Sequence, residues 1–205
     1  PTQTPGENAQ RYFAKYNKQK RTFEALTELI QETADDIQYL ESISNALDIA
    51  LSEADLAQIK EELMQSGYIR RKHTKKKVKL TSKPMHYISS DGYDMYVGKN
   101  NLQNEELTFS FANGNDWWFH AKGAPGSHVI VKSGGDELPD RTFEEAGRLA
   151  AYYSKNRGAD KVEIDYVEKK QVKKPGGGKP GFVVYYTNYS MVIDSNISQI
   201  RLCAD

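Results

Sequence analysis

The feature that most constrains this chain is a long stretch near its start without a helix-breaking residue. No Gly or Pro occurs between Glu7 and Leu51, and apolar residues recur there at spacings of three and four. This pattern predicts one long helix with a heptad seam, about 65 Å long at the usual rise per residue. The seam comprises Tyr12, Tyr16, Phe23, Leu26, Ile30, Ile37, Leu40, Leu47 and Leu51, and its remaining positions hold Gln19, Thr33 and Ser44. A lone helix cannot bury such a seam, so we expect it to have a partner.

A short second helix is predicted directly after the first. Ser52 is a typical N-cap, and Asp55 follows at the third helical position. Gly67 is the expected stop. The apolar stripe between them is Leu56, Ile59 and Leu63. We therefore predict an antiparallel coiled coil over residues 1–69, although a hairpin tip near residues 33–36, with two more equal arms, is an alternative.

A strongly basic linker is expected next, over residues 70–84. It holds eight Lys or Arg in the fourteen residues from Arg70 to Lys83. The net charge of zero hides an asymmetry, because residues 1–69 carry six basic against twelve acidic side chains and residues 70–205 carry twenty-two against sixteen. An excess of positive charge is typical of a nucleic-acid partner. A solvated tether is the alternative for the linker, whose candidate RNA contacts are Arg70, Arg71, Lys72, Lys75, Lys76 and Lys77.

The pattern changes to period two from Met85 onward, which predicts strands. The expected strands are MHYISS, YDMYVG, LTFSF, DWWFHA, SHVIVK, KVEIDYV, FVVYYT and SMVID. One amphipathic helix interrupts them, with Thr142 and Glu145 as its capping box, and Gly158 is expected to end it. Strands, one principal helix and further strands indicate an α+β fold. We therefore expect a mainly antiparallel β domain over residues 85–205.

Composition excludes several classes of protein. No run of about 18 apolar residues is present, so no membrane partner is expected. Cys203 is the only cysteine, which excludes an internal disulfide and fits a reducing cytoplasm. The chain begins with Pro1 and not Met, so we expect it to be part of a longer protein. No cofactor motif is found, and we expect no cofactor.

The segment from Asn115 to Lys132 is the richest in reactive side chains. His120 and His128 bracket a Gly/Pro loop and are eight positions apart. A zinc site needs three or four ligands and no third is obvious, so no metal is expected. Ser127 lacks the nucleophile-elbow motif of serine hydrolases, and no catalytic constellation is predicted.

The same segment suits RNA. Trp117, Trp118 and Phe119 alternate along a strand, so core packing accounts for at least one of the tryptophans. The other aromatic faces suit bases, and Lys122 and Lys132 suit phosphates. The loop from Gly123 to Ser127 can present backbone N–H groups to a phosphate.

A second basic segment, KKQVKKPGGGKPG, spans Lys169 to Gly181. It is not a P-loop, because Lys179 is followed by Pro180 and not by Ser or Thr. We interpret it as an electrostatic arm for a polyanion such as RNA. Its lysines are Lys169, Lys170, Lys173, Lys174 and Lys179.

Two signatures resemble one known family. DWWFHAKGAPGSHVIVK is similar to the D-x-W-x-H-x-K-x-x-P-G-S-H-V signature of the NFACT-R domain, and KKQVKKPGGGKPG to its second signature, V-x-K-P-x-G-x-x-P-G. TFEEAGRLAAYYSKNRGADKVEIDYV matches the segment between them, and GENAQRYFAKYNKQKR looks like the opening of the coiled-coil middle region. The resemblance to the NFACT family covers nearly the whole chain.

The resemblance implies a part in ribosome-associated quality control. Bacterial members, called RqcH, bind a large ribosomal subunit that carries a stalled peptidyl-tRNA and promote alanine tailing. It implies contact with ribosomal RNA, tRNA and, through the coiled coil, the stalk base. The Asp-Arg motif needed for tailing lies in a domain that this sequence does not include, so no tailing activity is expected of it alone.

Two rival interpretations come from other classes of protein. Older descriptions of the family as fibronectin-binding proteins of the FbpA type suggest a surface adhesin. An unpaired helix seam suggests instead a protein-interaction rod, with a homodimer through the coiled coil.

Overall fold

The computed structural model describes residues 4–70 and 82–203. It divides into two compact units, Pro1–Leu40 and Glu41–Asp205. Most of the predicted basic linker, including Arg71, Lys72 and Lys75 to Lys77, lies outside the described residues. Within the described ranges, no helix is long and apolar enough to cross a membrane.

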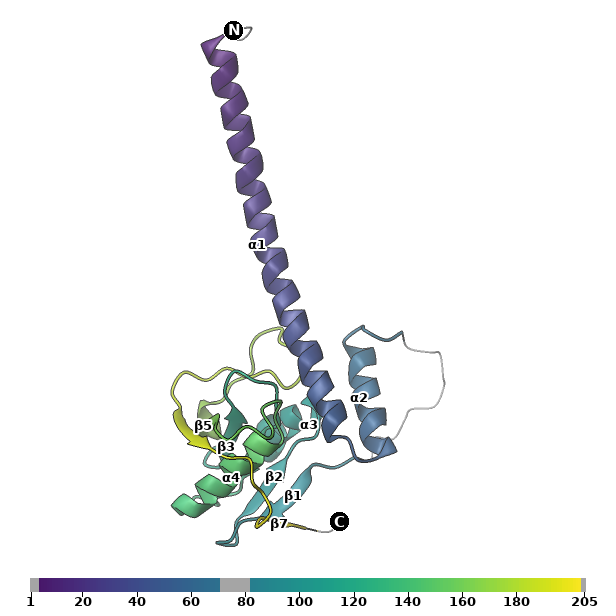
Figure 1. Ribbon diagram of the computed structural model, residues 1–205, viewed down its shortest axis with the longest axis vertical. Coiled ribbons are helices and arrows are strands. Elements are labelled where there is room, and N and C mark those ends of the chain that lie inside the picture. Colours follow the sequence, from purple (N-terminus) through teal and green to yellow (C-terminus); the bar gives the residue numbers. More distant parts are fainter. Residues whose placement is uncertain (1–3, 71–81, 204–205) are drawn as a thin grey trace. The chain divides into compact units, whose positions relative to one another are not determined.

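The first unit, as far as it is described, consists of helix α1 alone, which spans Pro5–Ile49 and continues into the second unit (Figure 1). The helix runs unbroken through residues 33–36, so the alternative turn predicted there is wrong. The seam residues from Tyr12 to Leu40 are at least 43% exposed. Neither the coiled coil nor its antiparallel pairing is confirmed, and both stay predictions.

The second unit begins with the end of α1 and helix α2, Glu53–Gln65. Ser52 is the N-cap as predicted and forms a capping box with Asp55, and Gly67 follows the helix with a positive φ of 81°. The Asp55 carboxylate lies 2.8 Å from Lys99 Nζ. Burial raises the pKa of Asp55, but hydrogen bonds from Lys99, Ser82 and the cap outweigh it and lower that pKa to about 2. This ion pair joins α2 to the segment that follows β2.

The β domain is one seven-stranded sheet in which every paired strand is antiparallel, in the order β6-β5-β3-β4-β2-β1-β7. The α+β class and the antiparallel sheet are confirmed. The strands are β1 Met85–Ile88, β2 Asp94–Val97, β3 Trp117–Ala121, β4 Val129–Val131, β5 Val162–Glu168, β6 Tyr189–Ile193 and β7 Arg201–Leu202.

Two predicted strands are not strands. The LTFSF segment is a π-helical turn, η1, Leu107–Phe111, which continues the short helix α3, Asn101–Glu106. Asn100 caps α3 by accepting a hydrogen bond from the backbone N–H of Gln103. The FVVYYT segment makes only an isolated bridge between Lys173 and Val184.

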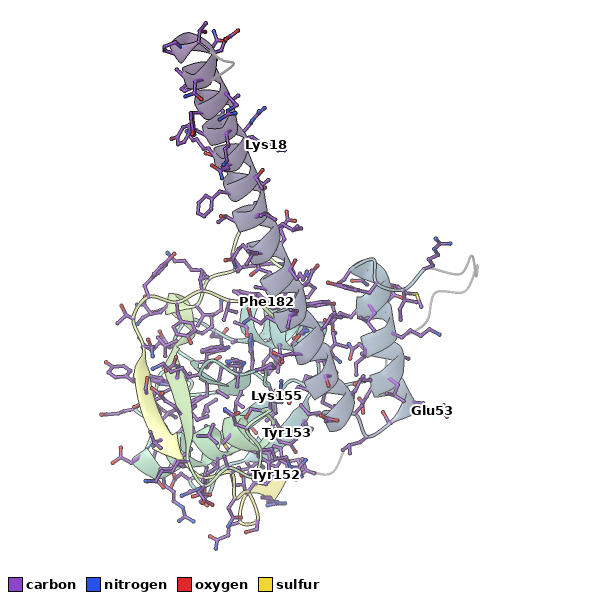
Figure 2. All side chains as sticks on the ribbon, turned by 45° about the horizontal axis from the view of Figure 1, so that its top comes forward. Lys18, Glu53, Tyr152, Tyr153, Lys155 and Phe182 are labelled. Carbon is purple, nitrogen blue, oxygen red and sulfur yellow. The ribbon has the colours of Figure 1, made fainter. Side chains whose placement is uncertain are left out.

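The principal helix is α4, Asp140–Tyr152, and its predicted capping box is wrong. Pro139 occupies the N-cap position. Thr142 instead donates to Asp91 at 2.7 Å, and Glu145 accepts from the backbone of Ser90 at 2.7 Å. Both side chains therefore hold the β1–β2 turn against the helix. At the other end of α4, Tyr152, Tyr153 and Lys155 lie close together (Figure 2), and the Tyr153 hydroxyl is 2.6 Å from that of Tyr87.

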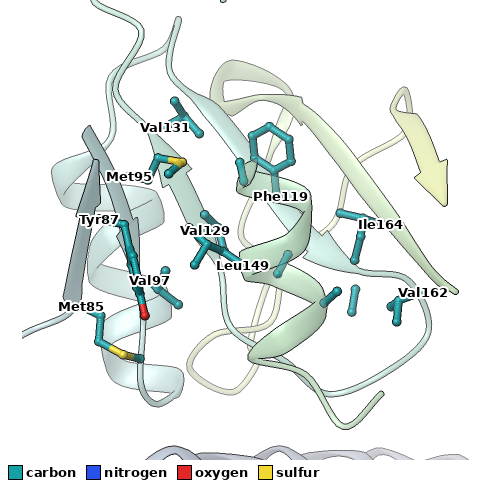
Figure 3. Close-up of a cluster of buried hydrophobic side chains, with 14 of the residues drawn as sticks. Met85, Tyr87, Met95, Val97, Phe119, Val129, Val131, Leu149, Val162 and Ile164 are labelled. Atoms are coloured by element: carbon teal, nitrogen blue, oxygen red, sulfur yellow. The ribbon is translucent and has the colours of Figure 1, made fainter. Parts of the chain in front are cut away.

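The sheet has two differently covered faces. On the first, which we call the α4 face, the sheet packs against Leu149 and its neighbours in α4 (Figure 3). That face contributes the larger core, with Tyr87, Met95, Phe119 and Ile164 among its members. The second, which we call the loop face, carries a smaller cluster of Leu107, Ala112, Trp118, Ile130, Val167 and Val172. The loop face is covered by η1 and by residues 172–185.

Candidate nucleic-acid interface

The first signature places one set of side chains on the loop face. Asp116, Trp118, His120 and Lys122 lie two residues apart along β3 and its flanks, so they point the same way. Trp118 is fully buried in the loop-face cluster, and its ring centroid is 5.6 Å from that of His120. Lys122 Nζ lies 2.5 Å from Glu163 on the neighbouring strand β5. The alternating pattern of the signature therefore describes one face of a strand.

The residue directly before strand β4, His128, brings a second histidine to the same place. The rings of His120 and His128 meet edge to face with centroids 5.4 Å apart. The backbone N–H of His128 donates to the Asn104 side chain at 3.0 Å, and its Nδ1 lies 2.8 Å from the Thr108 hydroxyl. Burial lowers the pKa of His120 to about 4 and that of His128 well below its usual value. Both rings are therefore neutral at physiological pH.

Two predicted RNA contacts lie inside the protein and not on its surface. Ser127 is 1% exposed and His128 is 2% exposed. They face the core because the loop turns back at Gly126, which bridges Ser154. Ser127 Oγ has no hydrogen-bond partner among the described residues, so it is not bonded to either histidine. These two side chains support the loop, and exposed neighbours are left to meet a ligand.

The signature aspartate has a structural position. Asp116 is buried, accepts a hydrogen bond from the backbone of Asn113 at 2.7 Å and pairs with Lys132. The Lys132 ammonium also lies 4.7 Å from the centre of the Phe111 ring. Lys132 is thus held at the surface by a buried carboxylate on one side and by an aromatic ring on the other.

The second signature and the residues that follow it cover the loop face, on which Trp118 and His120 of the first signature lie. Val172 belongs to the loop-face cluster, and Tyr185 lies 5.2 Å from Trp118 between ring centroids. The Tyr185 hydroxyl donates to Asp165 at 2.8 Å. Gly181 has a positive φ of 79°, and a Cβ there would come within 2.9 Å of Asn101. Residues 172–185, which we call the cover, are therefore fixed to β5 by Tyr185 and to α3 by Gly181.

The arm lysines differ in how far they are already paired. Lys170 lies 2.6 Å from Glu168, and Lys174 lies 2.6 Å from Glu105. Lys179 Nζ is 3.0 Å from the Tyr68 hydroxyl. Lys169 lies 5.9 Å from the centre of the Phe109 ring. Among the residues that the structure describes, neither Lys169 nor Lys173 forms an ion pair, so these two are the lysines most available to a phosphate.

Sequence reasoning missed the asparagine-rich helix that anchors this site. The Asn101 amide donates to Ser42 at 2.7 Å and to Glu62 at 2.8 Å. Glu105 accepts from both Lys174 and the backbone of Gly181. No periodic apolar pattern marks α3, and the only available signal was the group of Asn and Gln residues at positions 100–104.

The α4 face offers a contrasting surface. An open groove of about 650 Å³ lies between α4, β5 and β6. Its lining includes four carboxylates, Asp140, Glu144, Asp160 and Asp194, and two basic side chains, Arg148 and Lys161. This balance does not suit a polyanion. In the part of the chain that the structure covers, no three His, Cys, Asp or Glu side chains are grouped as a metal site requires.

Comparison with known proteins gives two adjoining family matches. Residues 1–82 match the family described as NFACT N-terminal and middle domains, and residues 83–186 match the NFACT protein RNA binding domain.

Curated relatives carry consistent names. "Rqc2 homolog RqcH" of Streptococcus pneumoniae serotype 2 (strain D39 / NCTC 7466) is 49% identical over 183 residues, covering 89% of this chain and 33% of that protein. The Bacillus subtilis (strain 168) protein of the same name is 40% identical over 198 residues, covering 94% of this chain and 34% of that protein. This chain spans about a third of the length of these curated relatives.

A solved structure shares the fold. It is described as the C-terminal of the fibronectin/fibrinogen-binding protein from Streptococcus suis (FBPS). It is 43% identical, with a TM-score of 0.86, and the match covers 97% of this chain and 79% of that one.

Proposed function

Because this chain belongs to the NFACT family, we propose that it is the RNA-binding part of a ribosome quality control factor. In the longer protein it would bind the obstructed large ribosomal subunit and tRNA while alanine is added to the stalled chain. The seam of α1 would be the contact to a stalk-base protein. On this proposal the chain itself is not an enzyme and works in the cytoplasm.

The observation that supports the proposal most is the gathering of basic side chains around one covered sheet face. Lys122 and Lys132 belong to the strand side, Lys169 and Lys170 lie in the 3-10 turn directly after β5, and the other arm lysines lie in the cover. Lys122 is paired with the exposed carboxylate of Glu163, and Lys170 and Lys174 are paired with the half-buried carboxylates of Glu168 and Glu105, whereas the partner of Lys132 is the buried Asp116. Exposed pairs contribute about 0–1 kcal/mol each, so a phosphate can replace the carboxylate at little cost. Contacts of this kind supply affinity and position, not sequence reading.

The test is binding to purified large ribosomal subunits and to tRNA across a salt series. We expect affinity to fall steeply as salt is raised, because bound lysines release counterions. Replacing the two lysines without ion pairs, in the double variant Lys169→Gln/Lys173→Gln, should weaken binding about tenfold and reduce the salt slope by roughly 1–2.

Two matched controls separate the arm from general charge. Lys170→Gln/Lys174→Gln removes the same charge from lysines that already have carboxylate partners, and it should weaken binding less. Lys60→Gln/Lys161→Gln removes two exposed lysines from α2 and from the α4-side groove, and it should leave binding unchanged. If the affinity for RNA is the same at low and high salt and is unchanged in the arm variants, the arm does not have this role.

Fibronectin binding is the second candidate function, supported by the description of the Streptococcus suis structure. An adhesin has no need of a lysine-rich arm. We therefore expect any affinity for immobilised fibronectin to be the same for the unmodified chain and for Lys169→Gln/Lys173→Gln. If this chain binds fibronectin but not subunits or tRNA, the adhesin is the better description.

A further inference from the structure

A row of aromatic rings lies on the loop face beyond the part covered by residues 172–185. His86 and Tyr96 are direct cross-strand partners on β1 and β2, and their rings stack with centroids 4.6 Å apart and planes 4° from parallel. Tyr96 meets Phe111 of η1 edge to face at 4.7 Å. We call His86, Tyr96 and Phe111 the aromatic row.

The row belongs to the same face as the proposed RNA contacts. Tyr96 pairs with Ile130 in the strand register, and Ile130 is part of the loop-face cluster. Tyr96 itself packs against that cluster. Lys132, one of the signature lysines, lies directly over the Phe111 ring. A strand of RNA held by the signature lysines would therefore pass next to the row.

Both ends of the row remain accessible. Phe111 is 41% exposed, and the His86 side chain is 32% exposed. Tyr96 is the only ring against which His86 packs among the described residues, so its other side is not covered by an aromatic group. At one end of the row Lys132 lies over Phe111. Beyond the other end Arg201 is exposed and pairs in register with Ile88, which lies on the same face of the sheet as His86.

The row is also held in place before any ligand arrives. His86 Nε2 lies 2.7 Å from Asp94 Oδ1, which fixes the plane of the imidazole ring. Tyr96 is partly buried between its two aromatic neighbours. Ordered aromatic side chains lose little conformational freedom on binding, and every base has a flat face that can stack on them.

We propose that the aromatic row is a stacking site for unpaired RNA bases. This inference rests on the proposed function, because the lysines hold the phosphates while the row takes the bases. It narrows the RNA to single-stranded segments, such as loops and ends, since bases inside a duplex cannot stack on a protein side chain. Stacking of this kind tolerates different sequences but favours the larger purine rings.

The test compares single-stranded and duplex RNA of matched length. Fluorescence anisotropy with the full chain would use labelled oligo(A), oligo(U) and a hairpin duplex. We expect Tyr96→Ala and Phe111→Ala each to weaken oligo(A) binding by about fivefold or more and to leave duplex binding and the salt slope unchanged. Tyr96→Phe, which keeps the ring, should bind as the unmodified chain does.

Controls guard against indirect effects. Tyr189→Ala removes an exposed tyrosine that stacks on Tyr166 at the α4 face, and it should leave oligo(A) binding intact. Tyr96→Ala also removes packing, so a melting curve accompanies it. If that variant is destabilised, Phe111→Ala decides the result, because the Phe111 side chain is already substantially exposed.

The outcomes distinguish this inference from the function on which it rests. If Lys169→Gln/Lys173→Gln weakens RNA binding but Phe111→Ala and Tyr96→Ala bind within twofold of the unmodified chain, the stacking site is wrong and the RNA-binding function stands. If the aromatic variants lose affinity for ribosomal subunits but not for free RNA, the row contacts a protein and the inference is overturned. If the unmodified chain binds neither the single-stranded oligonucleotides nor the hairpin duplex, both proposals fail.

Discussion

At the scale of single residues, most of the first signature builds the site and does not touch a ligand. Asp116 holds a turn and Lys132, Trp118 fills the loop-face cluster, and His128 is buried against Asn104 and Thr108. A motif of this kind is easily mistaken for a list of binding residues. Lys122, which is exposed next to these buried positions, is the signature side chain that remains accessible to a ligand.

The two neutral histidines make the stability of the domain depend on pH. Burial lowers the pKa of His120 to about 4, below its value in the unfolded chain. Between those two pKa values the unfolded state binds more protons, so folding stability is complete above about pH 6.5 and is lost as the pH falls. We expect His120 alone to lower the free energy of unfolding by on the order of 1–2 kcal/mol between pH 7 and pH 5, and His128, whose pKa is lowered in the same direction, to add to that loss.

Chemical denaturation at several pH values measures this effect. The double variant His120→Gln/His128→Gln lacks the groups that titrate, so its stability should change less over the same range, whatever its stability at pH 7. If the stability of that variant depends on pH as strongly as that of the unmodified chain, the loss of stability comes from carboxylates elsewhere and not from the histidines. Asp55 is not a candidate in this window, because its pKa of about 2 places its loss of stability at lower pH.

At the scale of elements, the cover over the loop face depends on one close approach. Gly181 combines a positive φ with the contact to Asn101, whereas Gly177 has a positive φ of 72° and open space around it. Gly181→Ala should therefore destabilise the cover by a few kcal/mol, and Gly177→Ala by only about 1 kcal/mol. Hydrogen exchange at the backbone amide of Val184, which donates to Lys173, reports on the cover directly.

The comparison between the two glycine variants separates contact from backbone strain. Equal loss of protection at Val184 would mean that the approach to Asn101 does not hold the cover. If instead Gly181→Ala opens the cover, it should also weaken RNA binding, since Lys173, Lys174 and Lys179 of the arm lie within the same segment.

Elements with a long or strongly alternating pattern could be predicted from the sequence, and short ambiguous ones could not. Local patterns in the sequence predict the α1 and α2 helices, the Ser52 cap and the two strands of the first signature, β3 and β4. LTFSF has five residues, too few to separate a period of two from a helical period. FVVYYT has strand composition, but Val183 and Tyr185 pack against the loop-face cluster instead of extending the sheet. Thr142 and Glu145 fit a capping box, yet tertiary partners in the β1–β2 turn hold both side chains.

The site could be predicted only in part for a related reason. The period-two signature and the lysines were visible in the sequence. The burial of Ser127 and His128 depends on how the loop packs, and the aromatic row joins residues from β1, β2 and η1. Such groupings arise from strand order, which single residues do not encode.

At the scale of the whole molecule, the two units differ in how they are stabilised. Unit Glu41–Asp205 contains both apolar clusters. The described part of unit Pro1–Leu40 is helix without a second element, and its large apolar side chains from Tyr12 to Ile37 are exposed. A helix of this kind is expected to acquire a partner, and in the isolated chain the available partner is a second copy.

We therefore expect the isolated chain to self-associate. Sedimentation velocity over a range of concentrations should show a shift from monomer toward dimer. Phe23→Gln/Ile30→Gln, at two seam positions, should raise the dissociation constant by at least about tenfold, because each buried apolar side chain contributes about 1.5–3 kcal/mol. Lys18→Gln is the control, since Lys18 is an exposed polar position of the same helix (Figure 2). A mass that does not change with concentration would contradict the expectation.

The strand order also has a consequence for the time course of synthesis. Strand β1 pairs with β7, so an early strand of the sheet cannot complete its hydrogen bonding until the last strand has been synthesised. Tyr185, which covers Trp118, follows it by 67 positions in the sequence. At roughly 5–20 residues per second the tryptophan side of the sheet stays bare for about 3–13 seconds during translation. A polypeptide of this design is therefore most exposed to proteases and chaperones while it is itself a nascent chain.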